Sequence, residues 1–274
     1  MSDISLSSGI RSNLLSLQNT SGLLNRTQTR LGTGKKVNSA IDNPTNYFTS
    51  VALQNRSSDL SARLDSIAKG IQTVKAADTG ITGIKSLIGQ LKGIVTDAQG
   101  TSSTSDQITL GKRFVEVRRQ IDRLAKDSGY DGVNLLDSGN LTINFSEKAG
   151  DSTLGLTGFS GGATSTDVGI STAAAADFTV AATLTQITKT LEDAETNLRN
   201  QSRSLSANLS VLTSRQDFTK NLVNVLTTGA NDLVNADTNE EAANLLALNT
   251  QQSLGVNALS LASQQAQSVL KLLG

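Results

Sequence analysis

The sequence predicts a mainly α-helical fold: an elongated bundle or coiled coil of long helices with one small β-hairpin region. Two observations carry this prediction. Apolar residues recur at three-, four- and seven-residue steps along most of the chain, which is the period of a helix face and not of a strand. Aromatic residues are only 3% of the 274 residues, so a globular core would be thin and the apolar surface is expected to lie in seams between helices.

Charge and composition exclude several classes of function. The 24 basic residues balance the 24 acidic ones, so no net charge steers the chain toward nucleic acid or an anionic membrane. The chain has no histidine and no cysteine, which removes the usual zinc ligands, histidine bases and thiolate nucleophiles. We therefore expect no enzyme activity, no metal and no cofactor.

The sequence predicts neither a membrane segment nor a cleaved signal peptide. No apolar run approaches the roughly 20 residues that span a bilayer. The first residues, MSDISLSSG, lack a basic region followed by an apolar one. We expect no membrane insertion, and two interpretations remain open: a cytoplasmic protein, or a protein exported by a route without signal cleavage.

The first expected helix carries a narrow apolar stripe. The residues placed at its a and d positions are Ile10, Leu14, Leu17, Leu24 and Leu31, with Ser21 and Gln28 in the remaining ones. A helix of this size is marginal in water by itself, so it is expected to need a partner helix. Gly32 and Gly34 are expected to end it.

A connector then interrupts the helical pattern between residues 30 and 50. It contains Pro44, the only proline of the chain. Asn43 is expected to cap the next helix and Pro44 to take its first position, since the fixed φ of proline suits that position and its missing donor is not needed there. The candidate connector residues, which would join two helical layers, are Gly32, Gly34, Asp42, Asn43 and Pro44.

A second apolar stripe runs from Leu53 to Val95 and predicts one long helix or a pair of helices. Five glycines lie inside it: Gly70, Gly80, Gly83, Gly89 and Gly93. Each costs a helix interior roughly 1 kcal/mol relative to alanine. They either mark breaks or let another part of the protein approach closely, and the undisturbed apolar period favours close packing.

A third helix is expected after Ser103, with Ser103 and Asp106 as its capping box. It carries several lysines and arginines. Interspersed acids and the lack of interleaved aromatics favour a solvated or intersubunit face over nucleic-acid binding.

Alternation of apolar and polar residues follows in LTINF at 141–145. It predicts a β-hairpin at about 134–147 that turns near Ser138 and Gly139. Residues 148–175 are rich in Gly, Ser and Thr with scattered apolar residues, and they are expected to form a short surface tip.

Helical period resumes near residue 176, continues to 226 and returns in a last segment. Thr238 and Glu241 are expected to form a capping box at the start of the last helix. Its seam, diluted by Gln252 and Gly255, consists of Leu245, Leu248, Leu259, Ala262, Ala266, Val269 and Leu273. Because this stripe mirrors the first one, the two ends of the chain are expected to pair as antiparallel helices.

Three separated motifs carry a family resemblance. They are RLGTGKKVNSAIDNPTNYFTSVALQNRSSDL from residue 30, GYDGVNLL at 129–136 and QQSLGVNALSLASQQAQSVLKLLG at 251–274. In this order they resemble the first core segment, the motif before the β-hairpin and the C-terminal signature of bacterial flagellin. The resemblance covers nearly the whole chain except residues 146–176, so it implies a short form without large outer variable domains.

The resemblance to flagellin implies a structural subunit that polymerises with itself into the flagellar filament for swimming motility. It implies an inner layer of terminal helices around a central channel, residues 1–34 with 237–274, and an outer helical core, residues 35–236. It also implies export through the flagellar type III apparatus with a chaperone, an extracellular location, and contacts with filament-cap and hook-junction proteins.

The same resemblance points to a segment that a toll-like innate immune receptor reads in many flagellins. The equivalent positions here are Gln90, Lys92 and Ile94, and Gln90 stands where the family carries a basic anchor. An amide cannot replace the forked, charge-assisted donors of an arginine. Weak or absent receptor activation is therefore expected.

Two other functions stay open at this level. A hook–filament junction protein has ends like those of flagellin, although the GYDGVNLL motif favours flagellin. A soluble coiled-coil signalling or adaptor module would also have long heptad helices, but it does not explain the hairpin or the motifs. Growth of long filaments from short seeds distinguishes flagellin from the junction protein.

Overall fold

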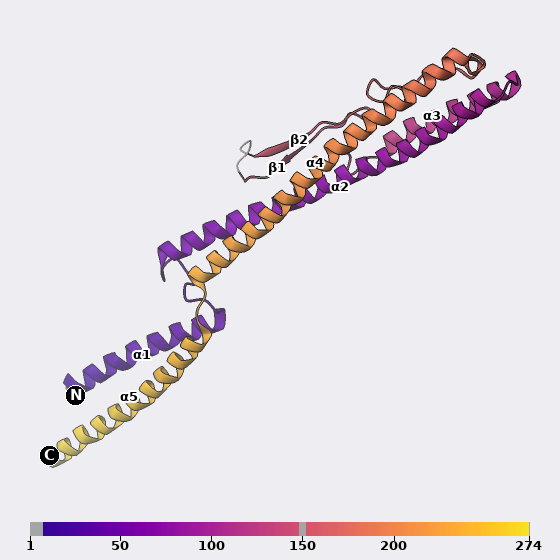
Figure 1. Ribbon diagram of the computed structural model, residues 1–274. Coiled ribbons are helices and arrows are strands. Elements are labelled where there is room, and N and C mark those ends of the chain that lie inside the picture. The colour runs from indigo at the N-terminus through magenta and orange to yellow at the C-terminus, as the bar shows by residue number, and fades with distance from the viewer. Residues whose placement is uncertain (1–7, 148–151, 274) are drawn as a thin grey trace. The chain divides into compact units, whose positions relative to one another are not determined.

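The computed structural model describes residues 8–147 and 152–273, and Figure 1 shows that most of them are helical. The helices are α1 (Ser8–Thr33), α2 (Pro44–Gly100), α3 (Thr104–Asp127), the 3₁₀ helix η1 (Ala175–Thr179), α4 (Ala181–Val234) and α5 (Thr238–Leu273). The strands are β1 (Leu141–Asn144) and β2 (Thr153–Leu156). The mainly α-helical fold with a small β region is therefore confirmed. Within the described ranges, no helix combines the length and the apolarity needed to cross a bilayer.

The chain divides into two compact units. The larger unit is Arg56–Asn224, and the smaller one combines Met1–Asn55 with Val225–Gly274. Because α2 and α4 each cross the boundary, both helices contribute residues to both units.

The larger unit has its core between α2, α3 and α4. Helix α4 runs antiparallel to α2, since Lys92 Nζ lies 2.6 Å from Glu195 and Ser202 Oγ donates to Asp78 at 2.8 Å. The buried side chains come from the apolar stripes of the three helices and include Ile67, Ile81, Ile88, Phe114, Ile121, Ile187 and Leu198. Each contributes roughly 1.5–3 kcal/mol by leaving water. The stripe from Leu53 to Val95 thus belongs to one uninterrupted helix.

The glycines inside α2 fall into two groups. A Cβ added at Gly70, Gly80 or Gly83 would collide with a neighbouring side chain, so the prediction of close packing is confirmed for these three. Gly89 and Gly93 have no neighbour within 4 Å of the place that a Cβ would take. For these two, close packing within the chain is wrong.

Helix α3 begins after Ser103, as predicted, but the predicted capping box is only half formed, because the Ser103 N–H donates to the Thr101 hydroxyl and not to Asp106. The Ser103 hydroxyl accepts a hydrogen bond from the Asp106 backbone N–H at 3.4 Å. Further along, Phe114 packs on Phe178 of η1 with ring centroids 5.1 Å apart. Gly111 lies directly against the backbone of η1, and these contacts hold η1 on α3.

The predicted hairpin at 134–147 is wrong in its pairing. Strand β1 pairs antiparallel with β2, which lies beyond that range. Ser138 and Gly139 do form a turn, in which the Gly139 N–H donates to the Asn134 carbonyl at 2.9 Å. That turn precedes β1 and does not join two strands. Alternation identified the first strand, whereas the Gly/Ser/Thr-rich composition concealed the second.

The described part of residues 148–175, which includes β2, also differs from the predicted surface tip. Apolar residues of the described part lie in the core of the larger unit: Leu156, Phe159, Ala163, Val168 and Ile170. The Asp122 carboxylate on α3 accepts the Ala163 N–H at 2.8 Å, and Arg118 donates to the Ser171 carbonyl at 2.9 Å. The segment is therefore folded against α3.

Candidate assembly interface

Helices α1 and α5 form an antiparallel pair in the smaller unit, so the predicted pairing of the two ends is confirmed (Figure 1). Two contacts give the direction. Arg30 near the end of α1 bonds Glu241 near the start of α5, whereas Leu17 in the middle of α1 touches Gly255 further along α5.

On α1 the seam alternates leucine with threonine. The apolar residues that are buried or half-buried in it are Ile10, Leu17, Leu24 and Leu31. Leu14, which the sequence placed in the same stripe, is 41% exposed, whereas Thr20 and Thr27 are buried. The Thr20 hydroxyl donates to the Ser16 carbonyl at 2.9 Å, which satisfies it inside the helix. Thr20 and Thr27 each lie three residues after a seam leucine, so helix geometry alone predicts their burial. A search for apolar residues omits them because threonine is polar.

On α5 the half-buried residues of the seam are Leu245, Leu248, Gln252, Gly255, Leu259 and Ala262. Gly255 was expected only to dilute this seam, yet it is the residue on which Leu17 of α1 packs. A Cβ on Gly255 would come within 2.7 Å of Leu17 Cδ2, so the bare backbone lets Leu17 pack directly on α5. The side chains of Ala266, Val269 and Leu273 fall outside the described residues.

A charged pair closes the seam beside the connector. Arg30 Nη1 donates to Glu241 Oε1 at 2.9 Å, and the Arg30 and Glu241 side chains are only 30% and 9% exposed. The predicted capping box of Thr238 with Glu241 is wrong. The Asp237 carboxylate accepts two backbone N–H groups of the first turn and caps α5 instead. The Glu241 carboxylate is thereby left to bind Arg30.

Two short segments link α1 and α5 to α2 and α4, and backbone hydrogen bonds join them. Helix α1 ends before Gly34, whose φ of 68° is left-handed, while Gly32 lies inside the helix and does not break it. The Val234 carbonyl accepts the Lys36 N–H at 2.7 Å, and the Gly34 carbonyl accepts the Ala236 N–H at 2.9 Å. The two connectors therefore form a short antiparallel bridge.

Asp42 ties the longer connector into a loop. Its carboxylate accepts the backbone N–H groups of Asn38 and Ser39, both at 3.0 Å, and the Ser39 hydroxyl at 3.1 Å. These backbone hydrogen bonds hold the pKa of Asp42 below its ordinary value, and the charge of Arg30 adds to the effect. The ionised carboxylate is thus the form that closes the loop.

Asn43 and Pro44 start α2. The Asn43 side-chain oxygen accepts the Asn46 N–H at 3.0 Å, and Pro44 is the first helical residue. The Asn46 side chain in turn donates to the Leu233 carbonyl at 3.4 Å, which ties the start of α2 to the end of α4.

Helices α1 and α5 also expose a second set of large apolar side chains. Each is more than 40% exposed: Leu14, Leu15 and Leu23 on α1, and Leu246, Leu254, Val256 and Leu261 on α5. Single exposed apolar residues are common, and these do not form one stripe, because Leu14 and Leu23 are nine residues apart and so lie on opposite sides of α1.

Helix α2 carries Gln90, Lys92 and Ile94, the positions predicted from the sequence to match a receptor-read segment. Gln90 is exposed, and Ile94 packs against the core. Lys92 is held by Glu195 of α4, which also binds Arg199 at 3.0 Å. The hydrogen bond from Lys92, and then its charge, keep the pKa of Glu195 below its ordinary value. The Lys92 ammonium group is therefore engaged in an ion pair with the Glu195 carboxylate.

Paired terminal helices and a hydrogen-bonded connector define a mainly α-helical protein whose two ends pack together. Residues 6–141 match the bacterial flagellin N-terminal helical region, and residues 188–273 match the bacterial flagellin C-terminal helical region. The chain belongs to the bacterial flagellin family.

Relatives of the same length support the short form. Flagellin FljM of Caulobacter vibrioides is 30% identical over 273 residues, covering 99% of this chain and 98% of the relative. The flagellin of Brucella melitensis is 29% identical over 280 residues, covering 99% of each. A crystal structure of Bacillus cereus flagellin is 21% identical with a TM-score of 0.47, over 55% of this chain and 86% of that one. The family assignment rests on the sequence matches alone.

Proposed function

We propose that this flagellin polymerises with copies of itself into the filament of the bacterial flagellum and so serves swimming motility. The observation that carries the proposal is the α1–α5 pair, which buries a dilute seam and leaves large apolar side chains such as Leu15 and Leu246 exposed. Burial of apolar surface contributes roughly 25 cal/mol per Å². Neighbouring copies that cover these side chains would gain that free energy at every addition.

The composition of the seam also supports dependence on neighbouring copies. Thr20, Thr27, Gln252 and Gly255 occupy seam positions that leucine would fill in a self-sufficient coiled coil. Each heptad therefore buries less apolar area. We infer that α1 and α5 reach their full stability only when helices of other copies pack on them.

We further propose that residues 1–34 with 237–274 form an inner layer of the filament around a central channel, and that residues 35–236 form the outer layer. Both ends of the chain lie in one compact unit, and the other unit has a core of its own, which supports such a division. The two compact units meet at residues 55/56 and 224/225, both of which lie within the proposed outer layer. The boundaries differ because α2 and α4 each contribute residues to both units.

An extracellular filament requires export of its subunits. We propose that the chain leaves the cell unfolded through the flagellar export apparatus with a chaperone, and that it meets junction proteins at the hook and a cap at the tip. The match to flagellins along nearly the entire chain supports this route. The same match supports our proposal that the chain acts as a structural protein.

We also propose that the toll-like innate receptor reads this chain weakly. Gln90 offers a neutral amide, and the charge of Lys92 is engaged by Glu195. Purified monomer is expected to give little signal in a receptor reporter assay, and Gln90→Arg is expected to raise it. Strong signalling by the unmodified chain would contradict the proposal.

Seeded growth tests the main proposal. Purified chain is mixed with short seeds sheared from its own filaments and imaged by electron microscopy. Long tubes of uniform diameter are the expected result. Seeds that bind the chain but do not elongate would overturn the proposal and favour a junction protein.

A further inference from the structure

The α1 side of the α1–α5 seam repeats itself every seven residues. Its large apolar residues recur at this period, and so do the smaller polar residues between them: Ile10, Leu17, Leu24 and Leu31, and Asn13, Thr20 and Thr27. All of them are buried or half-buried. A slide of α1 by seven residues, about 10.5 Å at 1.5 Å per residue, would therefore present nearly the same side chains to α5. The α1 seam by itself does not specify which register the pair adopts.

The apolar contacts of α5 fit two registers equally well. In the observed register Leu17 packs on Gly255, and the same spacing places Leu24 opposite Leu248. If α1 moved seven residues outward, Leu24 would pack on Gly255 and Leu31 would lie opposite Leu248. Each position of α5 would again receive a leucine, so neither the glycine nor the leucines distinguish the two registers.

The Arg30–Glu241 ion pair does distinguish them. Arg30 Nη1 lies 2.9 Å from Glu241 Oε1, and the Glu241 side chain is only 9% exposed. In the shifted register Arg30 would lie beside Leu248, and the Glu241 carboxylate would lose its cation while still largely shielded from water. An unpaired buried carboxylate is strongly unfavourable. A single polar contact in an apolar seam is a known way of specifying register.

The connectors permit such a movement of α1. Residues 235–237 join α5 to α4 directly, whereas residues 34–43 join α1 to α2 through the loop that Asp42 closes. Ten residues can span up to about 33 Å when extended, so the loop has enough length for a shift of α1 by seven residues. The hydrogen bond from Lys36 to Val234 would open in the same movement, so it supports the observed register from the connector side.

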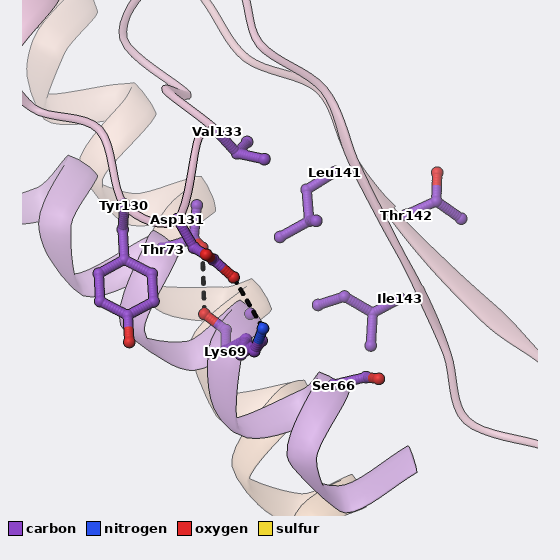
Figure 2. A pocket seen from close by; sticks show the side chains of 10 residues that line it. Ser66, Lys69, Thr73, Tyr130, Asp131, Val133, Leu141, Thr142 and Ile143 are labelled. Carbon is purple, nitrogen blue, oxygen red and sulfur yellow. Dashed lines mark hydrogen bonds and ion pairs between the residues drawn. The ribbon is translucent and has the colours of Figure 1, made fainter. Parts of the chain in front are cut away.

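The larger unit shows the same combination of a bare glycine and an ion pair at another contact. Ile143 of β1 packs where a Cβ of Gly70 would lie on α2, and Lys69 Nζ lies 2.9 Å from the Asp131 carboxylate (Figure 2). The glycine permits a close approach at each contact. The charged pair beside it is specific for one position along the helix.

We propose that the α1–α5 pair has a second register, one heptad from the observed one, and that the Arg30–Glu241 ion pair excludes it. The ion pair then determines how far α1 extends along α5. This is a property of the single chain and goes beyond the proposed polymerisation, so its test does not depend on filament growth.

An exchange of two residues tests the proposal. Glu241→Leu together with Leu248→Glu preserves composition and charge but moves the acid by one heptad, so Arg30 meets it only in the second register. Spin labels are attached at Ser12→Cys and Asn244→Cys, two exposed positions in a chain without other cysteines. The distance between the labels is measured by electron paramagnetic resonance in frozen monomer with trimethylamine N-oxide, which favours the folded pair. The exchange should lengthen it by about 10 Å, the rise of seven residues.

Two further variants make the outcome decisive. Glu241→Leu alone should show the longer distance beside the original one, because nothing then excludes the second register. Glu240→Leu together with Leu246→Glu, at exposed positions outside the seam, is the matched control and should keep the original distance. Absence of the longer distance from both the exchange and Glu241→Leu would overturn the proposal. An equal lengthening in the control would overturn it as well.

Discussion

Asp42 organises a connector that has no regular secondary structure, and the protonation of this one carboxylate should control the loop. Hydrogen bonds from Asn38 and Ser39 lower its folded pKa relative to the ordinary value of 3.8. The stabilisation is therefore fully present above pH 3.8 and is lost as the pH falls through the lower folded pKa. We expect the amide resonances of Asn38 and Ser39 to titrate together with a midpoint below 3.8 in NMR spectra. A midpoint above 3.8 would contradict this account.

The same carboxylate should matter more for the filament than for the monomer. Its three hydrogen bonds order only the loop, so Asp42→Ala is expected to slow seeded growth while leaving monomer unfolding nearly unchanged. Asp217→Ala, at an exposed position of α4, serves as the control. Normal filaments from a destabilised Asp42→Ala monomer would reverse the proposed role of the connector.

Asn43 is expected to stabilise α2 through its cap. Asn43→Ala removes the acceptor for the Asn46 N–H and should lower the free energy of unfolding by about 1 kcal/mol. Asn43→Asp keeps an acceptor at the same place and should retain most of it. Chemical denaturation of the monomer measures the difference, and equal losses in the two variants would rule out a capping role.

At the residue scale, the sequence predicted the burial of leucines in the α1–α5 seam better than the burial of the threonines between them. Leu17 and Leu24 stand out in any apolar count, whereas Thr20 is buried because its hydroxyl is satisfied by the helix backbone. That bond exists only once the helix has formed. Leu14 fits the apolar pattern equally well, and only the direction of the partner helix decides that it faces away.

At the element scale, the pairing of α1 with α5 contains an asymmetric ion pair. Arg30→Ala strands the nearly buried Glu241 carboxylate, which costs about 1–3 kcal/mol, whereas Glu241→Ala leaves an Arg30 that still reaches water. We expect Arg30→Ala to reduce hydrogen-exchange protection of α5 more than Glu241→Ala reduces it. The opposite order would show that the pair does not act through burial of the carboxylate.

Replacing a glycine by alanine should change the stability of the monomer in opposite directions at one position of α2 and one position of α3. Gly89→Ala fills open space on α2 and is expected to stabilise the monomer by about 0.5–1 kcal/mol. Gly111→Ala places a Cβ 2.6 Å from the Ala175 carbonyl oxygen and should destabilise it. Thermal unfolding of both variants measures the two signs, and a stabilising Gly111→Ala would show that η1 can move aside.

Elements with a long apolar period could be predicted, and short ones could not. The stripe of α2 extends over many turns, so single glycines do not obscure it. Strand β2 is only Thr153–Leu156, and its partner lies beyond a connection that no turn motif marks. The packed residues between β2 and η1 are held by contacts with Asp122 and Arg118, which are distant in the sequence.

At the scale of the whole molecule, the larger unit should fold without the ends. Its core lies between Ile67 and Leu212, inside Arg56–Asn224. A fragment of residues 56–224 is expected to unfold cooperatively with a helical circular-dichroism spectrum and to fail to elongate seeds. A fragment that is unfolded in isolation would show that the smaller unit supports the larger one.

The pairing of distant parts of the chain was predictable where two patterns mirrored each other, as at the two ends. The bridge between the connectors was not, because it consists of backbone hydrogen bonds such as that from Lys36 to Val234, which no side-chain pattern records. The 94% exposure of Ile41 in the connector was equally hidden, since its sequence neighbours do not distinguish a packed isoleucine from an exposed one.

The bridge between the connectors has a mechanical consequence. Residues 34–43 and 235–237 are the covalent links between the terminal helices and α2 and α4, so tension and torque between these parts must pass through both. Backbone hydrogen bonds join the two connectors. A force on either connector is therefore shared by the other and acts on several hydrogen bonds at once. In a rotating filament, the load on each subunit would thus pass through two connectors that are hydrogen-bonded to each other, and not through a single flexible linker.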